Sequence, residues 1–168
     1  MTSKVTPART PSAMAPNDPE AQLSVAISYG KLLPFLGPKE QIADSRLIKA
    51  SVDKVIALDS GNDLAWQVLG RWNFALADVN GVKRALAQVA FGKLPTAKYE
   101  DAVHCFEKAI ALNPNRLMHY IELGRTYVQM GKPDEARKCL AKGLAMPNTE
   151  KDDPETKDQG RQLLAKLH

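Results

Sequence analysis

The stretch that decides the fold is Tyr99–Met146, which reads YEDAVHCFEKAIALNPNRLMHYIELGRTYVQMGKPDEARKCLAKGLAM. Its residue types recur with a period of 34 residues, so that Ala102 falls on Ala136. Small residues alternate with large aromatic and aliphatic ones at helical spacing. Pro114 separates the two copies, because proline cannot continue a helix. The pattern therefore predicts pairs of short antiparallel helices.

A period of this length with this alternation is typical of the tetratricopeptide repeat (TPR), a helix–turn–helix unit. Two helices cross closely only where small residues let their backbones approach, and Gly124 and Ala136 supply that contact. One such unit cannot bury its own apolar face, so several must stack. We therefore predict an all-α fold, a TPR-like α-α superhelix, which is a helical repeat solenoid.

A second spacing reveals an insertion. Gly70 stands 54 residues before Gly124, which is one period plus 20 residues. The extra residues lie roughly over 76–95, inside the upstream repeat. Within them Val82 to Lys93 has the apolar periodicity of a short amphipathic helix. The sequence thus predicts a repeat interrupted by an inserted helix.

Capping residues and helix breakers place the other helices. Residues 1–17 are predicted to form a disordered N-terminal tail, and 18–168 a single TPR-like helical repeat domain. Leu163, Leu164 and Leu167 mark the last helix as a C-terminal cap. The expected helices run from about Pro19 to Leu33, Lys39 to Leu58, Asn62 or Asp63 to Val79, Val82 to Lys93, Thr96 or Ala97 to Leu112, from Asn115 as a cap to Gly131, from Pro133, and from Asp153.

Composition limits the class of protein. Hydrophobic residues make up 44% and aromatic residues only 6%, as in Ala/Leu-rich helices. No apolar run approaches the ~18 residues of a membrane span, so we expect no transmembrane segment. The start lacks the apolar core of a secretory signal. The net charge of +4 is compatible with an acidic partner. The two cysteines sit one period apart, and small buried fillers are favoured over a redox role.

Motifs for catalysis are missing from the sequence. No phosphate-binding loop or nucleophile motif is present. The three histidines, His104, His119 and His168, lack a cysteine or an acid at ligand spacing. We therefore expect no enzyme activity, no catalytic residues, no metal, no cofactor and no nucleic-acid partner.

The first helix of each pair lines the concave side in this repeat type, and this defines a candidate groove. Arg71 and Arg125 occupy equivalent positions in it. Two stacked arginines would suit an extended acidic peptide or an anionic lipid headgroup, although ordinary solvated arginines are an equally good interpretation. The Lys/Asn clamp of chaperone-binding repeats is absent there. The groove positions are Leu64, Gln67, Arg71, Phe74, Met118, Ile121, Arg125, Val128 and Gln129.

The insertion is the second candidate surface. It contains no acidic residue between Asp78 and Glu100, yet it carries four bases, Lys83, Arg84, Lys93 and Lys98. A solvated helix is the default interpretation, and a binding surface for acidic chains is the functional one. We expect the bases to remain exposed while Leu86 and Val89 pack on the solenoid.

Several of these segments together resemble the regulator of microtubule dynamics family. The resemblance covers about Ala26 to Leu167, and its most specific part is a Leu-Gly-Arg-Trp box followed by a Phe-Gly insertion. The segments that carry it are Ile42–Ser45, Leu69–Trp72, Ala90–Pro95, Tyr99–Ala102, Phe106–Ala109, Leu123–Gly124 and Gly131–Ala136.

The resemblance implies a cytoplasmic TPR protein associated with microtubules and spindle poles. Its partners would be microtubules, through acidic tubulin tails, or another protein. Some relatives are tethered to membranes and bind phospholipid, so a phospholipid-binding or lipid-transfer module is the alternative, and a generic peptide-binding adaptor is the fallback. Relatives usually carry a further repeat upstream, so we expect a short member or a fragment.

Overall fold

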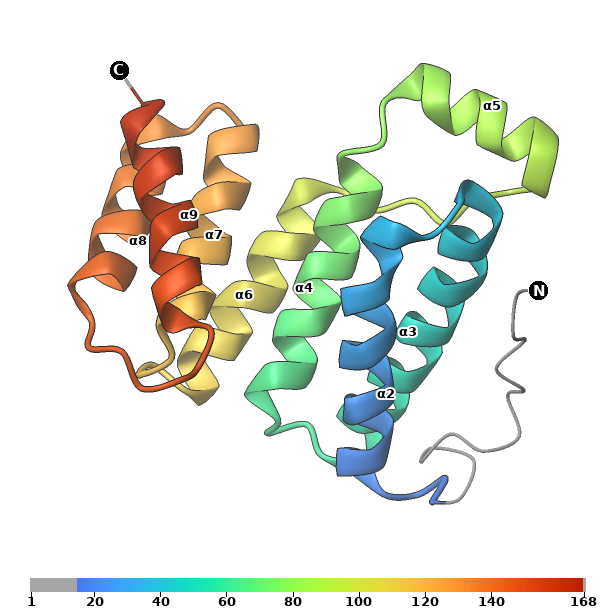
Figure 1. Cartoon of the computed structure of the whole chain (residues 1–168), viewed down its shortest axis with the longest axis horizontal. Coiled ribbons are helices and arrows are strands. Elements are labelled where there is room, and N and C mark those ends of the chain that lie inside the picture. The colour runs from blue at the N-terminus through green and yellow to red at the C-terminus, as the bar shows by residue number, and fades with distance from the viewer. Residues whose placement is uncertain (1–14, 168) are drawn as a thin grey trace. The chain divides into compact units, whose positions relative to one another are not determined.

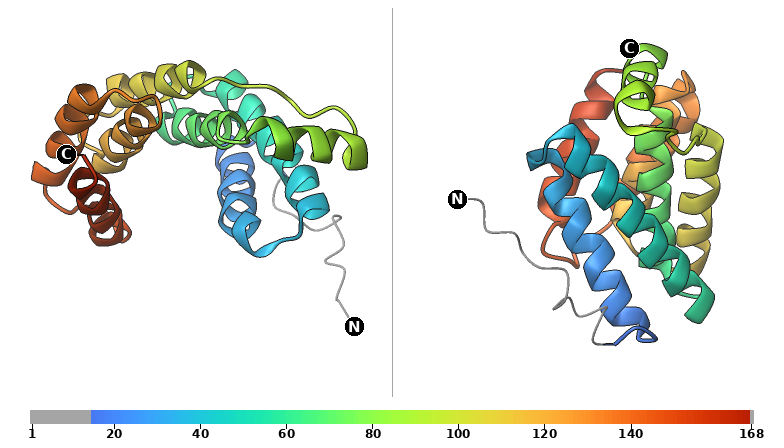
Figure 2. Two further views of the ribbon diagram at one scale, coloured as in Figure 1. Left: turned by 90° about the horizontal axis from the view of Figure 1, so that it is seen from above. Right: turned by 90° about the vertical axis from the view of Figure 1, so that its right-hand side faces the viewer.

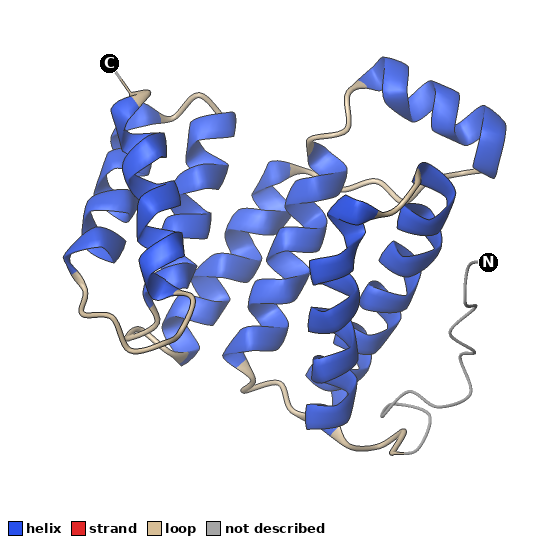
Figure 3. Cartoon of the chain, in the orientation of Figure 1, coloured by secondary structure: helices blue, strands red, loops and turns tan. Residues whose placement is uncertain are grey.

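The computed structural model describes residues 15–167, and within this range helices joined by loops are present and no strand is (Figure 3). The predicted all-α, TPR-like class is confirmed. Of the tail predicted to be disordered over 1–17, residues 1–14 lie outside the described residues. The helices are α2 (Pro19–Leu32), the 3-10 helix η2 (Leu33–Phe35), α3 (Pro38–Leu58), α4 (Asp63–Ala77), α5 (Gly81–Phe91), α6 (Tyr99–Leu112), α7 (Leu117–Gln129), α8 (Pro133–Ala145) and α9 (Asp153–Ala165).

The chain divides into two compact units, one up to Val68 and one from Leu69 onward. The single domain predicted over 18–168 stays a prediction. In the first unit α2 packs against α3, and the two helices run side by side in Figures 1 and 2. Its core contains Leu23, Val55 and Ala65, which are buried and meet partly buried aliphatic neighbours.

The second unit contains a run of neighbouring helices. Helix α6 packs on α7, α7 packs on α8, and α9 packs on both α7 and α8 (Figure 1). Phe106 and Leu123 belong to one of its apolar clusters, and Leu117 and Leu140 to another. Leu163, Leu164 and Leu167 of α9 pack against the second cluster. The predicted C-terminal capping helix is therefore confirmed.

Side-chain caps explain several of the helix starts. Asp18 Oδ1 accepts from the backbone N–H of Glu20 at 2.9 Å, and Asn62 Oδ1 accepts from Ala65 N at 3.0 Å. These bonds satisfy backbone donors that have no partner within the helix. Both residues stand at the predicted starts of their helices, from about Pro19 and from Asn62 or Asp63.

Two of the predicted helix starts are wrong. Helix α6 begins at Tyr99 and not at Thr96 or Ala97, because Asp101 Oδ2 accepts from Lys98 N at 2.8 Å and so defines the first turn. Asn115 does not cap α7. Its own N–H instead donates to Asn113 Oδ1 at 3.3 Å, in the turn before the helix.

The predicted close helix crossings are present. A Cβ atom added to Gly124 would lie 2.7 Å from Cγ of Leu140, and one added to Gly70 would lie 2.7 Å from Cε1 of Phe106. Real Cβ atoms essentially never approach so closely. Gly70 and Gly124 are equivalent in the repeat, as are Phe106 and Leu140, so the structure has the register expected from the sequence.

An aromatic residue fastens the preceding turn in each of these repeats. The indole N–H of Trp66 donates to the carbonyl of Ser60 at 2.9 Å. The phenol of Tyr120 donates to the carbonyl of Pro114 at the same distance. The two pairs are related by the same spacing as the two glycines. Each turn between repeats is therefore held by the helix that follows it.

Candidate binding surfaces

The two groove arginines converge on one buried carboxylate. Arg125 Nη2 lies 2.9 Å from Glu122 Oε2, and Arg71 Nε lies 3.5 Å from Glu122 Oε1. Only 8% of the Glu122 side chain is exposed, whereas Arg71 exposes 55% of its side chain. An ionised carboxylate at such a site requires nearby positive charge, because its removal from water costs several kcal/mol. The arginines therefore stabilise Glu122, and their charge is partly neutralised.

Phe74 links this ion-pair cluster to the core. The guanidinium carbon of Arg125 lies 4.3 Å from the centre of the Phe74 ring, within the range of a cation–π contact. Phe74 also contacts Tyr99, and the centres of the two rings lie 5.5 Å apart. Phe74 is itself buried against Ala102 and Phe106. Arg125 is thus held in place by both its charge and its planar group.

The other predicted groove positions differ in accessibility. Ile121 is only 3% exposed, because it packs in the cluster covered by α9. Gln67 is also buried, and it lies with Leu64 in the first unit. The remaining groove residues, Met118, Val128 and Gln129, are partly or fully exposed in the second unit. Ile121 and Phe74 are thus core residues, a role that the repeat pattern alone could not distinguish from groove lining.

The inserted helix α5 lies between α4 and α6, as predicted, and its two ends are tied together. The guanidinium of Arg84 donates to the carbonyl of Leu76 at 2.7 Å and to that of Pro95 at 2.8 Å. The phenol of Tyr99 donates to Asp78 Oδ1 at 2.8 Å, and Leu94 is buried. The insertion is therefore a closed loop, and not a free excursion of the chain.

Two expectations about α5 are wrong. Arg84 is not a free surface base, because it serves the backbone carbonyls at both ends of the insertion. Leu86 and Val89 do not pack on the repeats: they expose 67% and 90% of their surface. The reason is that the hydrogen bonds of Arg84 hold its face of the helix toward Leu76 and Pro95, and Leu86 and Val89 lie on the opposite face. The other three bases, Lys83, Lys93 and Lys98, are exposed as predicted.

Burial and neighbouring carboxylates raise the pKa of three groups in the second unit, Tyr99, Tyr127 and Cys139. Desolvation, followed by the hydrogen bond and charge of Asp78, raises the pKa of Tyr99 to about 12. Burial, followed by the charges of Glu107 and Glu135, raises the pKa of the Cys139 thiol. A raised pKa keeps that thiol protonated and poorly nucleophilic. Cys105 is buried, and neither cysteine forms a disulfide.

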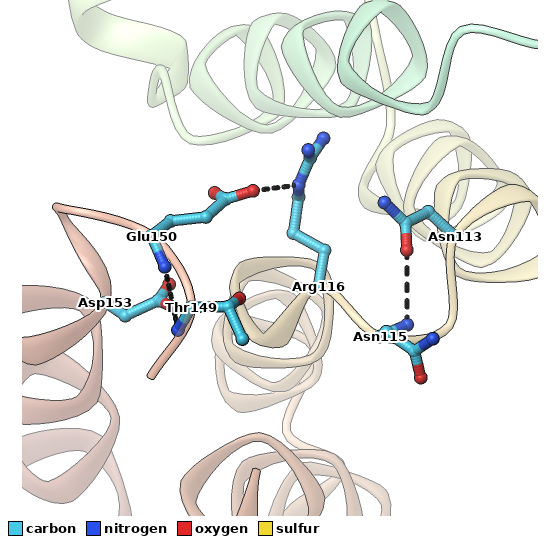
Figure 4. Close-up of polar contacts among 6 residues, drawn as sticks. All are labelled: Asn113, Asn115, Arg116, Thr149, Glu150 and Asp153. Carbon is cyan, nitrogen blue, oxygen red and sulfur yellow. Dashed lines mark hydrogen bonds and ion pairs between the residues drawn. The ribbon is translucent and has the colours of Figure 1, made fainter. Parts of the chain in front are cut away.

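The connection before α9 contains a polar joint (Figure 4). Asp153 Oδ2 accepts from the backbone N–H groups of Thr149 and Glu150 at 2.7 and 2.8 Å, and Asp153 is only 1% exposed. The Glu150 carboxylate in turn lies 2.7 Å from Nε of Arg116, at the start of α7. Asp153 was predicted only as part of a helix start. The joint positions α9 over α7.

No helix in residues 15–167 is long and apolar enough to cross a membrane. Within the same residues no three His, Cys, Asp or Glu side chains gather in a way that could hold a metal ion.

Helix crossings at equivalent glycines, neighbouring helices in chain order and a covering last helix define a TPR-like helical repeat protein. A solved structure described as the crystal structure of MamA matches with a TM-score of 0.57 and 19% identity, covering 93% of this chain and 80% of that one. A second MamA structure matches with a TM-score of 0.53 and 21% identity, covering 93% and 70%. At such identities the likeness concerns the fold alone.

The family model described as Regulator of microtubule dynamics protein 1-3 matches residues 6–168, and the chain belongs to this family. Among curated relatives, regulator of microtubule dynamics protein 1 of Mus musculus is 28% identical over 84% of this chain and 47% of its own length. Protein 2 of Mus musculus is 25% identical over 91% and 38%. Protein 1 of Caenorhabditis elegans is 24% identical over 89% and 67%. The chain thus spans less than half the length of the two mouse relatives.

Proposed function

We propose that this chain is a non-catalytic binding module that associates with microtubules and regulates their dynamics. Membership of the regulator of microtubule dynamics family supports this function. The observation that carries the proposal is the acid-free insertion, on which Lys83, Lys93 and Lys98 are all exposed. The exposed tails of tubulin are strongly acidic, so they are attracted to a surface that carries lysines and no acids. The proposal includes a cytoplasmic location at microtubules and spindle poles.

Arg84 has a supporting role in this proposal. Its two hydrogen bonds to backbone carbonyls hold the insertion closed, so it presents the lysines without needing to touch tubulin. Lys83 lies in the first turn of α5, while Lys93 and Lys98 follow its end. Each exposed contact is weak by itself and is screened by salt, since the Debye length is about 10 Å at 0.1 M. Several lysines must therefore act together.

The test is microtubule co-sedimentation of the full chain at increasing salt. The variant Lys83→Glu, Lys93→Glu, Lys98→Glu should lose most binding, and wild-type binding should fall as salt rises. The melting temperature of this triple variant should stay close to that of the wild type, because surface substitutions usually cost within ~0.5 kcal/mol each. A matched control reverses three exposed lysines on other elements, Lys39, Lys138 and Lys151. Equal losses in both variants, or full binding by the insertion variant, would contradict the proposal.

The groove offers the second candidate, an anionic headgroup or an acidic peptide beside Arg71. In its favour is the exposure of Arg71, together with the partly buried Met118 of the same unit. Against it, Glu122 already partly neutralises both arginines. Native mass spectrometry of the purified chain tests a phospholipid-binding or lipid-transfer module directly. Retained phospholipid together with no co-sedimentation would favour that module over microtubule association, and a captured acidic peptide would favour an adaptor.

A further inference from the structure

Helix α5 presents an apolar stripe to solvent. Val82, Leu86 and Val89 follow one another at intervals of four and three residues, and so lie on one face of the helix. They expose 73%, 67% and 90% of their surface, and no residue of α5 is buried. Apolar side chains exposed in a row on a monomer indicate an interaction site more often than single ones do. This stripe has no part in the charge-based proposal above.

The opposite face of α5 holds the helix to its own unit. At about 100° per residue, Arg84 falls on the side of the helix away from the stripe. From there it donates to the carbonyls of Leu76 and Pro95, while the buried Leu94 anchors the returning chain. In Figure 1 and in the left view of Figure 2, α5 stands away from α7, α8 and α9 of the same unit. The stripe is therefore directed outward by a specific pair of hydrogen bonds.

The charge around the stripe has one sign. Lys83 borders it next to Leu86 on the helix, and Lys93 and Lys98 follow the end of the helix. No acidic residue occurs between Asp78 and Glu100. A partner that covers the stripe must therefore be apolar at its centre and negatively charged around it. An anionic lipid surface has this combination, because acyl chains lie just below acidic headgroups.

We propose that α5 docks the protein on the surface of an anionic phospholipid bilayer, with Val82, Leu86 and Val89 inserted between the headgroups. The side chains project from a convex helix, and a bilayer needs no concave wall to receive them. Basic amphipathic helices of this kind lie in the plane of the interface with their apolar face about 5–10 Å deep. The occupant is the bilayer surface itself, and not a lipid extracted into the groove. The inference does not depend on microtubule association.

Binding by so short a stripe should be weak and reversible. Each basic residue near an anionic surface contributes about fivefold to the binding constant. The three aliphatic side chains supply the part of the affinity that salt does not remove, since apolar burial is insensitive to charge screening. Loss of either component should therefore return the protein to solution, but only the lysine component should depend on ionic strength.

The experiment is flotation of the full chain with vesicles of phosphatidylcholine, alone and with phosphatidylserine added. Wild type should float with the mixed vesicles and not with phosphatidylcholine alone. The variant Val82→Ser, Leu86→Ser, Val89→Ser should bind at least about tenfold more weakly. A control replaces Leu47, Leu58 and Leu112, which are exposed on other helices, with serine and should float as wild type does. Circular dichroism melting should show both variants folded.

Three outcomes would overturn the proposal. One is that the wild type does not float with the vesicles that contain phosphatidylserine. Another is that the stripe variant floats as well as wild type. The third is that the stripe variant loses microtubule co-sedimentation while wild type fails to float, which would make the stripe a protein contact. The result of the lysine-reversal variant in microtubule co-sedimentation does not change the flotation of wild type or of the stripe variant. The two proposals are therefore separable.

Discussion

At the scale of single residues, glycines decide how closely the helices cross. Gly124 faces Leu140 so tightly that an added Cβ would lie 2.7 Å from Leu140 Cγ and 3.3 Å from its backbone nitrogen. The backbone contact cannot be relieved by a side-chain rotation. By contrast, Gly30 lies within α2 and has nothing within 4 Å of an added Cβ. The same substitution should therefore have opposite effects at the two positions.

We predict that Gly124→Ala lowers the free energy of unfolding by roughly 1–3 kcal/mol through overpacking. Gly30→Ala should instead raise it by about 0.5–1 kcal/mol, because alanine costs less entropy in a helix. Urea denaturation of both variants and the wild type measures the difference. If Gly124→Ala were as stable as wild type, α7 and α8 would not cross at this residue.

Some contacts of these single residues are predictable from residue type and spacing, and others are not. The glycines and their bulky partners were predictable, because close packing demands those residue types at fixed spacing. The convergence of Arg71 and Arg125 on Glu122 was missed. A signal was present, since Glu122 and Arg125 are three residues apart on one helix, a spacing that favours ion pairs. The contact with Arg71 had no such local signal, because it joins different helices.

At the scale of the element, the insertion shows what side-chain pattern cannot predict. Its place in the chain followed from the register of the repeat, and its helix from the apolar periodicity of Val82 to Lys93. The face that turns outward could not be predicted, because it is set by hydrogen bonds from Arg84 to the backbone carbonyls of Leu76 and Pro95. Every residue has a backbone carbonyl, so the sequence contains no signal for these two acceptors. Apolar residues at helical spacing normally face a core, so the pattern predicts Leu86 and Val89 to be buried, whereas both are exposed.

Tyr99 provides a pH-dependent test of how the insertion is closed. Its pKa is raised to about 12, from an ordinary value near 10, while its phenol donates to Asp78. The unfolded chain therefore loses this proton at a lower pH than the folded chain. The contribution of Tyr99 to stability is complete below pH 10 and is lost as pH rises toward 12.

We predict that Tyr99→Phe lowers the free energy of unfolding at pH 7 by about 1 kcal/mol, the net contribution of a typical hydrogen bond. The gap between wild type and variant should shrink between pH 10 and pH 12. Urea denaturation at several pH values measures it, and Tyr120→Phe is the control, because Tyr120 donates to an uncharged carbonyl. A gap for Tyr99→Phe that stays constant with pH would mean that Asp78 does not control this phenol.

At the scale of the whole molecule, each unit has its own core, and α9 completes the second one. Leu163, Leu164 and Leu167 pack on the cluster that contains Leu117 and Leu140. Gly160 lets the helix approach, since an added Cβ there would lie 2.7 Å from Cδ1 of Ile121. Asp153 and the Arg116–Glu150 pair hold the connection that leads into α9. Stacked repeats leave an apolar end, which a terminal helix must cover.

We predict that deletion of Asp153–His168 exposes this apolar end and makes the protein aggregate. Each aliphatic side chain left uncovered forfeits up to roughly 1.5–3 kcal/mol, so the melting temperature should also fall. Light scattering and thermal unfolding of the truncated chain measure both effects. Because a truncation can act in other ways, Leu163→Ser, Leu164→Ser should reproduce the loss in part, while the exposed Lys166→Ser should leave stability unchanged. A truncated protein that remained monomeric and equally stable would show that α7 and α8 need no cover.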